Sequence, residues 1–253
     1  MTIDQPSQHQ LPQLRQLWKE AFADEDAFLD SFFRVGYAPE RCRCLTLEDQ
    51  VCAVLYWFDA QFEDQKIAYL YAVATAKSHQ KQGLCRRLME DTHRHLTALG
   101  YDLAVLVPCG PELFAFYEKL GYLNLSAVEE YTCQAAGSAA AVRCVSAEEY
   151  AALRRNLLPR DAVIQEGVTL AFLQTFCTFY AGNGFLLAGY TDKNRLIATE
   201  FLGEPSAAPG ILKALDIPEG KFRMPGSQMP FAMYRQLTEN ALPLPAYFGL
   251  ALD

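Results

Sequence analysis

Apolar residues in the first part of the chain change from the spacing of helices to the spacing of strands. Between Leu11 and Phe22 they recur at intervals of three and four residues, which predicts an amphipathic helix. A second, short helix is expected over residues 26–33. Runs rich in Val, Tyr, Phe and Ile then predict three successive strands, which cover residues 41–47, 51–58 and 66–75.

Helical spacing returns after the third strand. Residues 83–99 have apolar positions at helical intervals, and Gly100 stands where such a helix would end. A strand over 101–107, a short helix over 112–120 and a further strand complete the pattern. The order helix, helix, three strands, helix, strand, helix, strand predicts a mixed α/β sheet with helices on both faces.

A stretch of small, uncharged residues interrupts this pattern at 134–141, QAAGSAAA, and is typical of a linker. We therefore expect a first domain over 1–133 and a second over 142–253. The second half repeats the order of the first. It has helical patterns at 148–157, 169–180 and 208–215, and strand-like runs at 185–190, 195–202, 221–224, 231–237 and 247–252. Residues 234–237 also resemble 117–120, so we expect a divergent internal duplication.

Composition narrows the class of protein. With 253 residues, 51% of them hydrophobic and 21% charged, the chain is long and apolar enough for a packed globular enzyme. The net charge of −8 disfavours nucleic acid and anionic membranes as partners. The first ten residues lack the features of a signal peptide, and no apolar stretch is long enough to span a membrane, so a cytoplasmic location is expected.

Cysteine and histidine spacing does not indicate a metal site. The chain has 8 cysteines but no Cys-x-x-Cys pair, and the Cys42-Arg43-Cys44 spacing is typical of a strand with one buried face. His93 and His95 are two residues apart, which places them on different faces of a helix. No metal is expected.

The most informative stretch runs from the end of the third strand into the following helix, which begins at Gly83. The first amides of a helix are unpaired and lie at the positive end of its dipole, so they can bind a diphosphate. Lys81 and Arg86 add positive charge in an otherwise acidic protein. The alternative is that Gly83 only eases a turn and that the basic residues are solvated. Neither a P-loop nor a Rossmann glycine pattern occurs here.

This stretch resembles the signature of the GCN5-related N-acetyltransferases (GNAT), Gln/Arg-x-x-Gly-x-Gly/Ala after a strand. Val-Ala-Thr at 73–75, four residues and then Gln-x-x-Gly-Leu at 80–84, with Leu-Val-Pro at 106–108 and Phe-Tyr-Glu-Lys-Leu-Gly-Tyr at 116–122, resemble the enhanced-intracellular-survival (Eis) branch. The resemblance covers about residues 45–122. Two positions depart from the branch: Cys85 replaces a Gly or Ala, and Gln80 replaces the commoner Arg.

The resemblance implies a GNAT fold, acetyl-CoA as co-substrate and direct attack by an amine. It implies that the strand end pairs with the pantetheine arm and that the following turn holds the diphosphate. The residues implied for these roles are Val73, Ala74 and Thr75 in the strand, and Gln80, Lys81, Gln82, Gly83, Leu84, Cys85 and Arg86 in the turn. Tyr117 matches the family's general acid, which protonates the departing thiolate. In the branch the terminal carboxylate can reach the active site, which makes Asp253 a candidate base.

The second half lacks a comparable turn. Its corresponding segment, 203–210, has no basic residue and contains two prolines, which have no N–H to donate. We therefore expect a degenerate GNAT-like domain that walls the acceptor site and does not bind CoA.

The function indicated is transfer of an acetyl group from acetyl-CoA to a primary amine on a small molecule or peptide. Two alternatives stay open, a catalytically silent CoA-binding regulator and a protein-interaction module. The sequence does not identify the amine, the general base or the oligomeric state, and it is compatible with a homo-oligomer.

Overall fold

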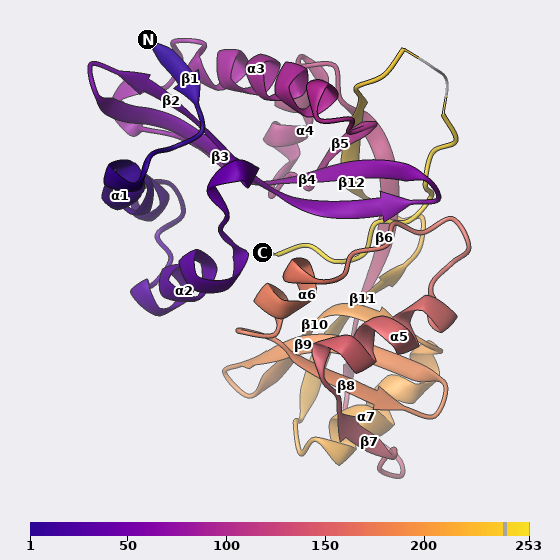
Figure 1. Ribbon diagram of the computed structural model, residues 1–253. Helices are drawn as coiled ribbons and strands as arrows, with labels where there is room; N and C mark the ends of the chain where they lie inside the picture. Colours follow the sequence, from indigo (N-terminus) through magenta and orange to yellow (C-terminus); the bar gives the residue numbers. More distant parts are fainter. Residues whose placement is uncertain (240–241, 253) are drawn as a thin grey trace. The chain divides into compact units, whose positions relative to one another are not determined.

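The structure of the chain is a computed structural model that describes residues 1–239 and 242–252. Its contacts divide it into two compact units. The first unit is Met1–Leu123 with Met233–Leu242, and the second unit is Asn124–Ala232 with Pro243–Asp253. Each unit is a mixed sheet that carries helices, as the change between helical and strand spacing predicts (Figure 1).

The sheet of the first unit has the strand order β1-β2-β3-β4-β5-β12. Neighbouring strands are antiparallel except for β4 and β5, which are parallel. The strands are β1 (Thr2–Asp4), β2 (Cys42–Leu47), β3 (Gln50–Phe62), β4 (Gln65–Thr75), β5 (Leu103–Leu106) and β12 (Met229–Gln236), which pairs with β5 from Met233 onward.

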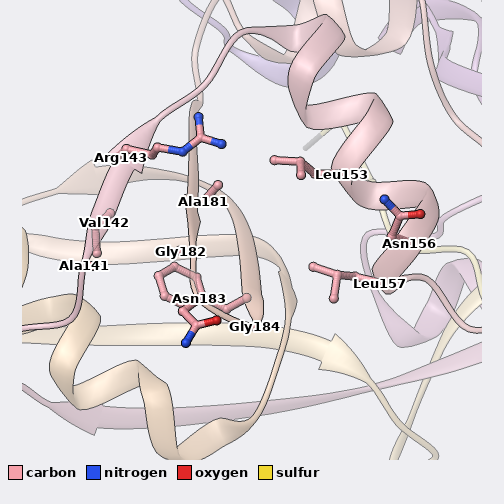
Figure 2. A pocket seen from close by; sticks show the side chains of 11 residues that line it. Ala141, Val142, Arg143, Leu153, Asn156, Leu157, Ala181, Gly182, Asn183 and Gly184 are labelled. Atoms are coloured by element: carbon pink, nitrogen blue, oxygen red, sulfur yellow. The ribbon is translucent and has the colours of Figure 1, made fainter.

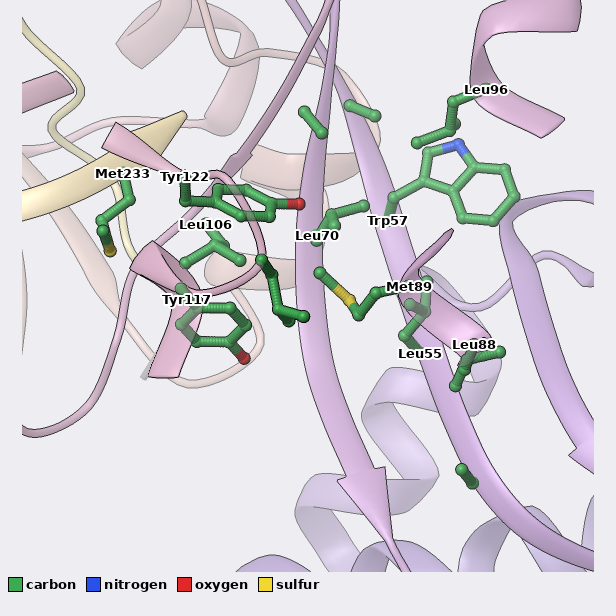
Figure 3. Packing of buried hydrophobic residues seen from close by; sticks show 14 of the residues in the cluster. Leu55, Trp57, Leu70, Leu88, Met89, Leu96, Leu106, Tyr117, Tyr122 and Met233 are labelled. Carbon is green, nitrogen blue, oxygen red and sulfur yellow. The ribbon is translucent and has the colours of Figure 1, made fainter. Parts of the chain in front are cut away.

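Helices cover both faces of this sheet, because alternate residues of β3 point in opposite directions. Leu55 and Trp57 lie in an apolar cluster with residues of α3 and α4 (Figure 3). Tyr56 faces the other way, with its ring centroid 5.4 Å from that of Trp18 in α1. The helices are η1 (Gln8–Gln10), α1 (Leu11–Phe22), α2 (Asp26–Ser31), the π-turn η2 (Phe32–Gly36), η3 (Pro39–Arg41), η4 (Lys77–His79), α3 (Leu84–Ala98) and α4 (Pro111–Glu118).

The second unit repeats the same order of elements, and its strands follow the order β7-β8-β9-β10-β11-β6. As in the first unit, a single pair, β10 and β11, is parallel. The strands are β6 (Leu123–Gln134), β7 (Val142–Cys144), β8 (Thr178–Gly182), β9 (Phe185–Asp192), β10 (Arg195–Leu202) and β11 (Glu219–Pro225). The helices are α5 (Ala147–Leu157), α6 (Val168–Leu173), η5 (Pro205–Ala207) and α7 (Ala208–Ala214).

The division of the chain differs from the one expected at 134–141. The structure divides at Leu123 and Asn124, so β6 belongs to the second unit although it directly follows the first in sequence. Conversely, residues 233–242 return to the first unit, where β12 pairs with β5. Gln134 is the last residue of β6, and residues 135–141 are a loop between β6 and β7 within the second unit. The expected ranges 1–133 and 142–253 therefore do not match the compact units.

Three local expectations were also wrong. The predicted helix over 169–180 ends at Leu173, and Thr178 begins β8, which pairs with β9. The expected strand at 247–252 makes one isolated bridge, between Ala162 and Tyr247. The likeness between 117–120 and 234–237 is not structural, because the first segment closes α4 whereas the second lies largely in β12.

No helix in residues 1–239 and 242–252 is both long and apolar enough to cross a membrane. Over the same residues, no group of three or more His, Cys, Asp or Glu side chains is arranged to hold a metal ion.

Candidate functional site

The turn between β4 and α3 leaves the start of the helix without a cap. Lys81 and Gly83 adopt left-handed backbone conformations, with φ of 60° and 78°. No side chain caps α3, and its first intrahelical bond is from the Arg87 amide to the Gly83 oxygen, at 3.1 Å. The amides from Gly83 to Arg86 thus have no acceptor in the part of the chain that the structure describes. Unpaired amides at the positive end of a helix form a binding site for an anion.

Gly83 is needed in this turn for its backbone conformation, and it also leaves room for a ligand. A Cβ atom added at Gly83 would meet no other atom of the protein within 4 Å. A side chain there would therefore point into open space. The left-handed φ favours glycine independently of this space.

Basic side chains surround the turn. Lys77, Lys81, Arg86 and Arg87 are all exposed. The ion pairs formed on α3 involve Asp91 and Arg94 instead, and none of the four basic side chains is in an ion pair with a residue that the structure describes. In a chain with a net charge of −8, this local excess of positive charge favours an anionic ligand.

The two glutamines of the predicted motif brace the turn. The Gln80 side-chain amide donates to the Thr75 carbonyl at 3.3 Å, and the Gln82 side-chain amide donates to the Ser78 carbonyl at 3.2 Å. Leu84 is buried in the apolar cluster of the first unit and so anchors the first turn of α3. Gln80, Gln82 and Leu84 therefore stabilise the shape of the turn.

The end of β4 has an open backbone edge. The parallel pairing with β5 stops at Tyr69 and Val105, whereas β4 continues to Thr75. On its other edge β4 stays paired with β3, and the Ala76 amide donates to the Cys52 carbonyl at 2.9 Å. Because amides alternate between the two edges of a strand, those of Val73 and Thr75 face the open edge. An extended ligand can pair there as an added strand.

Tyr117 combines a buried ring with an unpaired hydroxyl. The residue is 7% exposed and belongs to the apolar cluster of the first unit. No residue that the structure describes forms a hydrogen bond with its hydroxyl, which points away from Tyr122 and Leu106 in Figure 3. Burial raises the pKa of Tyr117 above its usual value. Its proton is therefore retained at neutral pH and remains available for donation.

Cys85 lies where β4, α3 and Tyr117 come together. Its side chain packs against the cluster that contains Tyr117, and the Thr75 side chain slightly offsets the effect of burial on the pKa of its thiol. Burial raises the pKa of the Cys85 thiol to about 11, so it is a neutral, weakly reactive group at pH 7. The predicted strand residues, the predicted turn and Tyr117 thus meet at one place in the first unit.

Two features of this place were not predicted. Ala72 has φ of 48° and lies in a bulge of β4, where the register shifts opposite Val54 and Tyr56. Nothing marks it in sequence, because alanine carries no preference for this conformation. Cys109, which is exposed, makes a small contribution to the raised pKa of Tyr117. In the sequence, only the position of Cys109 just before α4 could have connected it with the site.

Asp253, the candidate base, lies outside the residues that the structure describes. The segment that leads to it is buried in the second unit, with Phe248, Leu250 and Leu252 no more than 1% exposed. Gln165 brackets Leu250 with two hydrogen bonds, to its carbonyl at 2.6 Å and from its amide at 3.1 Å.

The second unit contains a separate pocket of about 520 Å³ between the β7–β9 strands and α5 (Figure 2). Its lining is largely apolar, with Val142, Leu153, Leu157 and Phe185 as the larger apolar side chains. Arg143 is the one charged residue in the lining, and it is paired with Glu149 at 2.6 Å. This pocket contains no residue of the predicted site and offers no unpaired acid or base.

Comparison with known families is decisive for the first unit. Residues 2–124 match the family described as acetyltransferase (GNAT) domain. The first unit is a GNAT acetyltransferase domain. The match covers β4, the turn, α3 and α4, and therefore every predicted site residue except Asp253.

Solved GNAT structures resemble the chain over almost its full length. A GCN5-related N-acetyltransferase from Kribbella flavida is 14% identical with a TM-score of 0.69, covering 93% of this chain and 70% of its own. Eis1 from Mycobacterium abscessus is 9% identical with a TM-score of 0.65, covering 94% and 74%. A tandem GNAT protein from the clavulanic acid biosynthesis pathway is 11% identical with a TM-score of 0.56, covering 95% and 99%. At these identities the likeness establishes the fold.

No protein of curated function matches the sequence significantly. The predicted GNAT fold, with a second GNAT-like unit, is confirmed, and the full-length likeness to Eis1 agrees with the resemblance to the enhanced-intracellular-survival branch. Residues 2–124 of the chain therefore form an acetyltransferase domain of the GNAT family.

Proposed function

We propose that the first unit transfers the acetyl group of acetyl-CoA to a primary amine by direct attack, with Tyr117 as general acid. The observation that carries this proposal is the convergence of three features. They are the open edge of β4, the uncapped start of α3 and the unpaired hydroxyl of the buried Tyr117. Together they offer a place for an extended arm, a diphosphate and a departing thiolate.

The diphosphate of CoA suits the turn before α3. The unpaired amides from Gly83 to Arg86 would donate to its oxygens, and the exposed Lys81 and Arg86 would balance its charge. The open space beside Gly83 admits the phosphates close to the backbone. The fit rests on backbone donors, so the turn needs few side chains to hold the phosphates.

The pantetheine arm would extend the sheet along the open edge of β4. An amide of Val73 or Thr75 would then donate to the thioester carbonyl oxygen and stabilise the negative charge that forms when the amine attacks. A well-placed donor of this kind lowers the barrier by roughly 3 kcal/mol. The strand end therefore both binds and activates the donor.

In the reaction the amine nitrogen forms a bond to the acetyl carbon, and the carbon–sulfur bond breaks. The Tyr117 hydroxyl gives its proton to the departing thiolate, and the nitrogen loses a proton to a base or to water. The raised pKa of Tyr117 keeps the phenol protonated until the sulfur becomes negative. The role of Asp253 as the base and the cytoplasmic location stay predictions.

The second unit keeps the strand arrangement of the first but lacks its donors. Its parallel pairing ends at Ala198 and Phe222, and β10 has a bulge next to Glu200, as β4 has at Ala72. However, the segment after β10 contains Pro205 and Pro209 and no basic residue, and β11 is followed directly by β12, with no helix equivalent to α4. This unit thus offers neither a row of amides nor a general acid, and we propose that it binds no CoA.

Replacement of Tyr117 by phenylalanine tests the proposed acid. We expect Tyr117→Phe to lower kcat about 100-fold, the usual contribution of a positioned acid, while KM for acetyl-CoA stays within about twofold. The assay follows release of the CoA thiol with a panel of amines. Tyr180→Phe, in the second unit, is the matched control and should keep the wild-type kcat.

Two results would speak against the proposal. An unchanged kcat in Tyr117→Phe would remove Tyr117 from the mechanism. If the wild-type protein binds CoA, shown by a raised Tm, yet releases no thiol with any amine, the alternative of a silent CoA-binding regulator gains the support.

A further inference from the structure

The ring of Tyr117 rests on the ring of Tyr122. The two centroids are 5.6 Å apart and the rings meet edge to face, at 63°. The backbone joins them as well, because the Tyr122 amide donates to the Tyr117 carbonyl at 3.1 Å. Tyr122 is completely buried, so its ring forms a fixed support that sets the direction of the Tyr117 hydroxyl.

Tyr122 is itself held by α3. A hydrogen bond of 2.8 Å joins its hydroxyl to Nε2 of His93, a residue that is 6% exposed. Burial, with a smaller effect from Arg235, lowers the pKa of His93 to about 3, so the imidazole is neutral at working pH. The support beneath Tyr117 thus ends on a neutral, buried side chain of the helix that begins at Gly83.

This arrangement connects the two halves of the proposed site. α3 presents the amides for the diphosphate at its start and carries His93 further along the same rigid helix. The turn that closes α4 is anchored separately by Arg235, whose guanidinium donates to the Leu120 carbonyl. The distance from the diphosphate site to the Tyr117 hydroxyl is therefore set through His93 and Tyr122.

We infer that Tyr122 and His93 are a positioning pair for the general acid, which they hold at a fixed place relative to the diphosphate-binding helix. Neither side chain touches the reacting atoms in this scheme, and both act through Tyr117. The inference rests on the proposed function, because it assigns these residues a role only if Tyr117 donates the proton.

Tyr122→Phe removes the hydrogen bond and keeps the supporting ring. We expect kcat to fall on the order of tenfold, because a displaced acid transfers its proton less efficiently, with KM for acetyl-CoA within about twofold. His93→Leu should cause a similar loss. His93→Gln, whose amide can still bond to the Tyr122 hydroxyl, should recover most of it. Thermal melting of each variant verifies that it is folded.

The double variant separates positioning from general stability. In a Tyr117→Phe background, adding Tyr122→Phe should cause no further loss of kcat, because no proton donor remains to be positioned. Losses that multiply would overturn the inference, as would a wild-type kcat in folded Tyr122→Phe. If Tyr117→Phe alone keeps its kcat, the proposed function fails. If only Tyr122→Phe keeps it, the positioning role fails and the proposed function stands.

Discussion

Single residues show which parts of the site were accessible from sequence. The need for glycine at position 83 followed from the physics of a helix start beside a phosphate, and the structure adds a left-handed φ of 78°. Tyr122 entered the sequence analysis only as the end of the motif at 116–122, and it is completely buried. Cys85 was noted only as a replacement for a Gly or Ala, yet it packs against the apolar cluster that contains Tyr117. The residue types therefore indicated the kind of surroundings at these positions. The contacts that the residues make depend on parts of the chain that are distant in sequence.

The buried His93 makes the stability of the protein depend on pH. Its pKa in the folded protein is about 3, against an ordinary value of 6.5. Below pH 6.5 the unfolded chain takes up a proton on His93 that the folded protein refuses until about pH 3. The contribution of neutral His93 to the free energy of unfolding is therefore complete above pH 6.5. It is lost as the pH falls toward 3, by about 1.4 kcal/mol per pH unit.

Urea unfolding of wild type and His93→Gln between pH 4 and pH 7 measures this effect. As the pH falls, the free energy of unfolding should decrease less steeply in His93→Gln than in wild type. The reason is that the unfolded variant has no His93 to bind a proton. Equal slopes for the two proteins would show that His93 is not buried in a neutral form.

At the scale of elements, strong periodicity predicted structure well. The helix expected at Leu11–Phe22 has those bounds in the structure, and the three strands that follow it appear as β2, β3 and β4. The failures occur where pairing across the sheet overrides local pattern. Thr178 was expected in a helix but pairs with Gly189 in β9, and the bulge at Ala72 has no signal in its own residue type.

The C-terminal segment of the second unit packs against a buried charged group. Glu200 accepts two hydrogen bonds from Arg154, at 2.7 and 2.8 Å, and one from the Tyr150 hydroxyl at 2.9 Å. A Cβ atom at Gly249 would overlap its carboxylate and the Tyr247 hydroxyl. Because these groups are held in place, we expect Gly249→Ala to lower the free energy of unfolding by roughly 1 to 3 kcal/mol.

Denaturant unfolding with a second glycine variant checks the cause. Gly137 also lies in the second unit, but a Cβ there meets nothing within 4 Å, and only its φ of 69° opposes a side chain. Gly137→Ala should therefore cost about 1 kcal/mol at most. A Gly249→Ala protein as stable as wild type would show that the C-terminal segment does not pack closely on Glu200.

At the scale of the whole molecule, the repeated GNAT topology was predictable but its boundaries were not. The order of helices and strands is local information, and it indicated two similar units. The assignment of β6 to the second unit and of residues 233–242 to the first depends on which strands pair. Sheet pairing joins residues far apart in sequence, so a loop with the composition of a linker was mistaken for the boundary.

The difference between local sequence pattern and long-range contact also applies to the site. Residues 73–86 are contiguous, so their chemistry could be recognised as one motif. Tyr117 was assigned through resemblance to a family, and its meeting with Thr75 and Cys85 became visible only in the fold. Each unit has one pair of parallel strands that separate before their ends, so the two topologies look alike. Their helix starts differ in charge, because basic residues surround the start of α3 whereas the segment 203–210 at the start of α7 has none.

The central claim is that the amides at Gly83 bind the diphosphate of one CoA molecule per chain. Isothermal titration of CoA into the intact protein tests it directly, with Gly83→Asp beside Gly100→Asp as a matched control, since both glycines have left-handed φ and open space for a Cβ. We predict one site per chain, a Kd raised at least about tenfold in Gly83→Asp, and a wild-type Kd in Gly100→Asp. Binding of two CoA molecules, or undiminished affinity in folded Gly83→Asp, would contradict the claim.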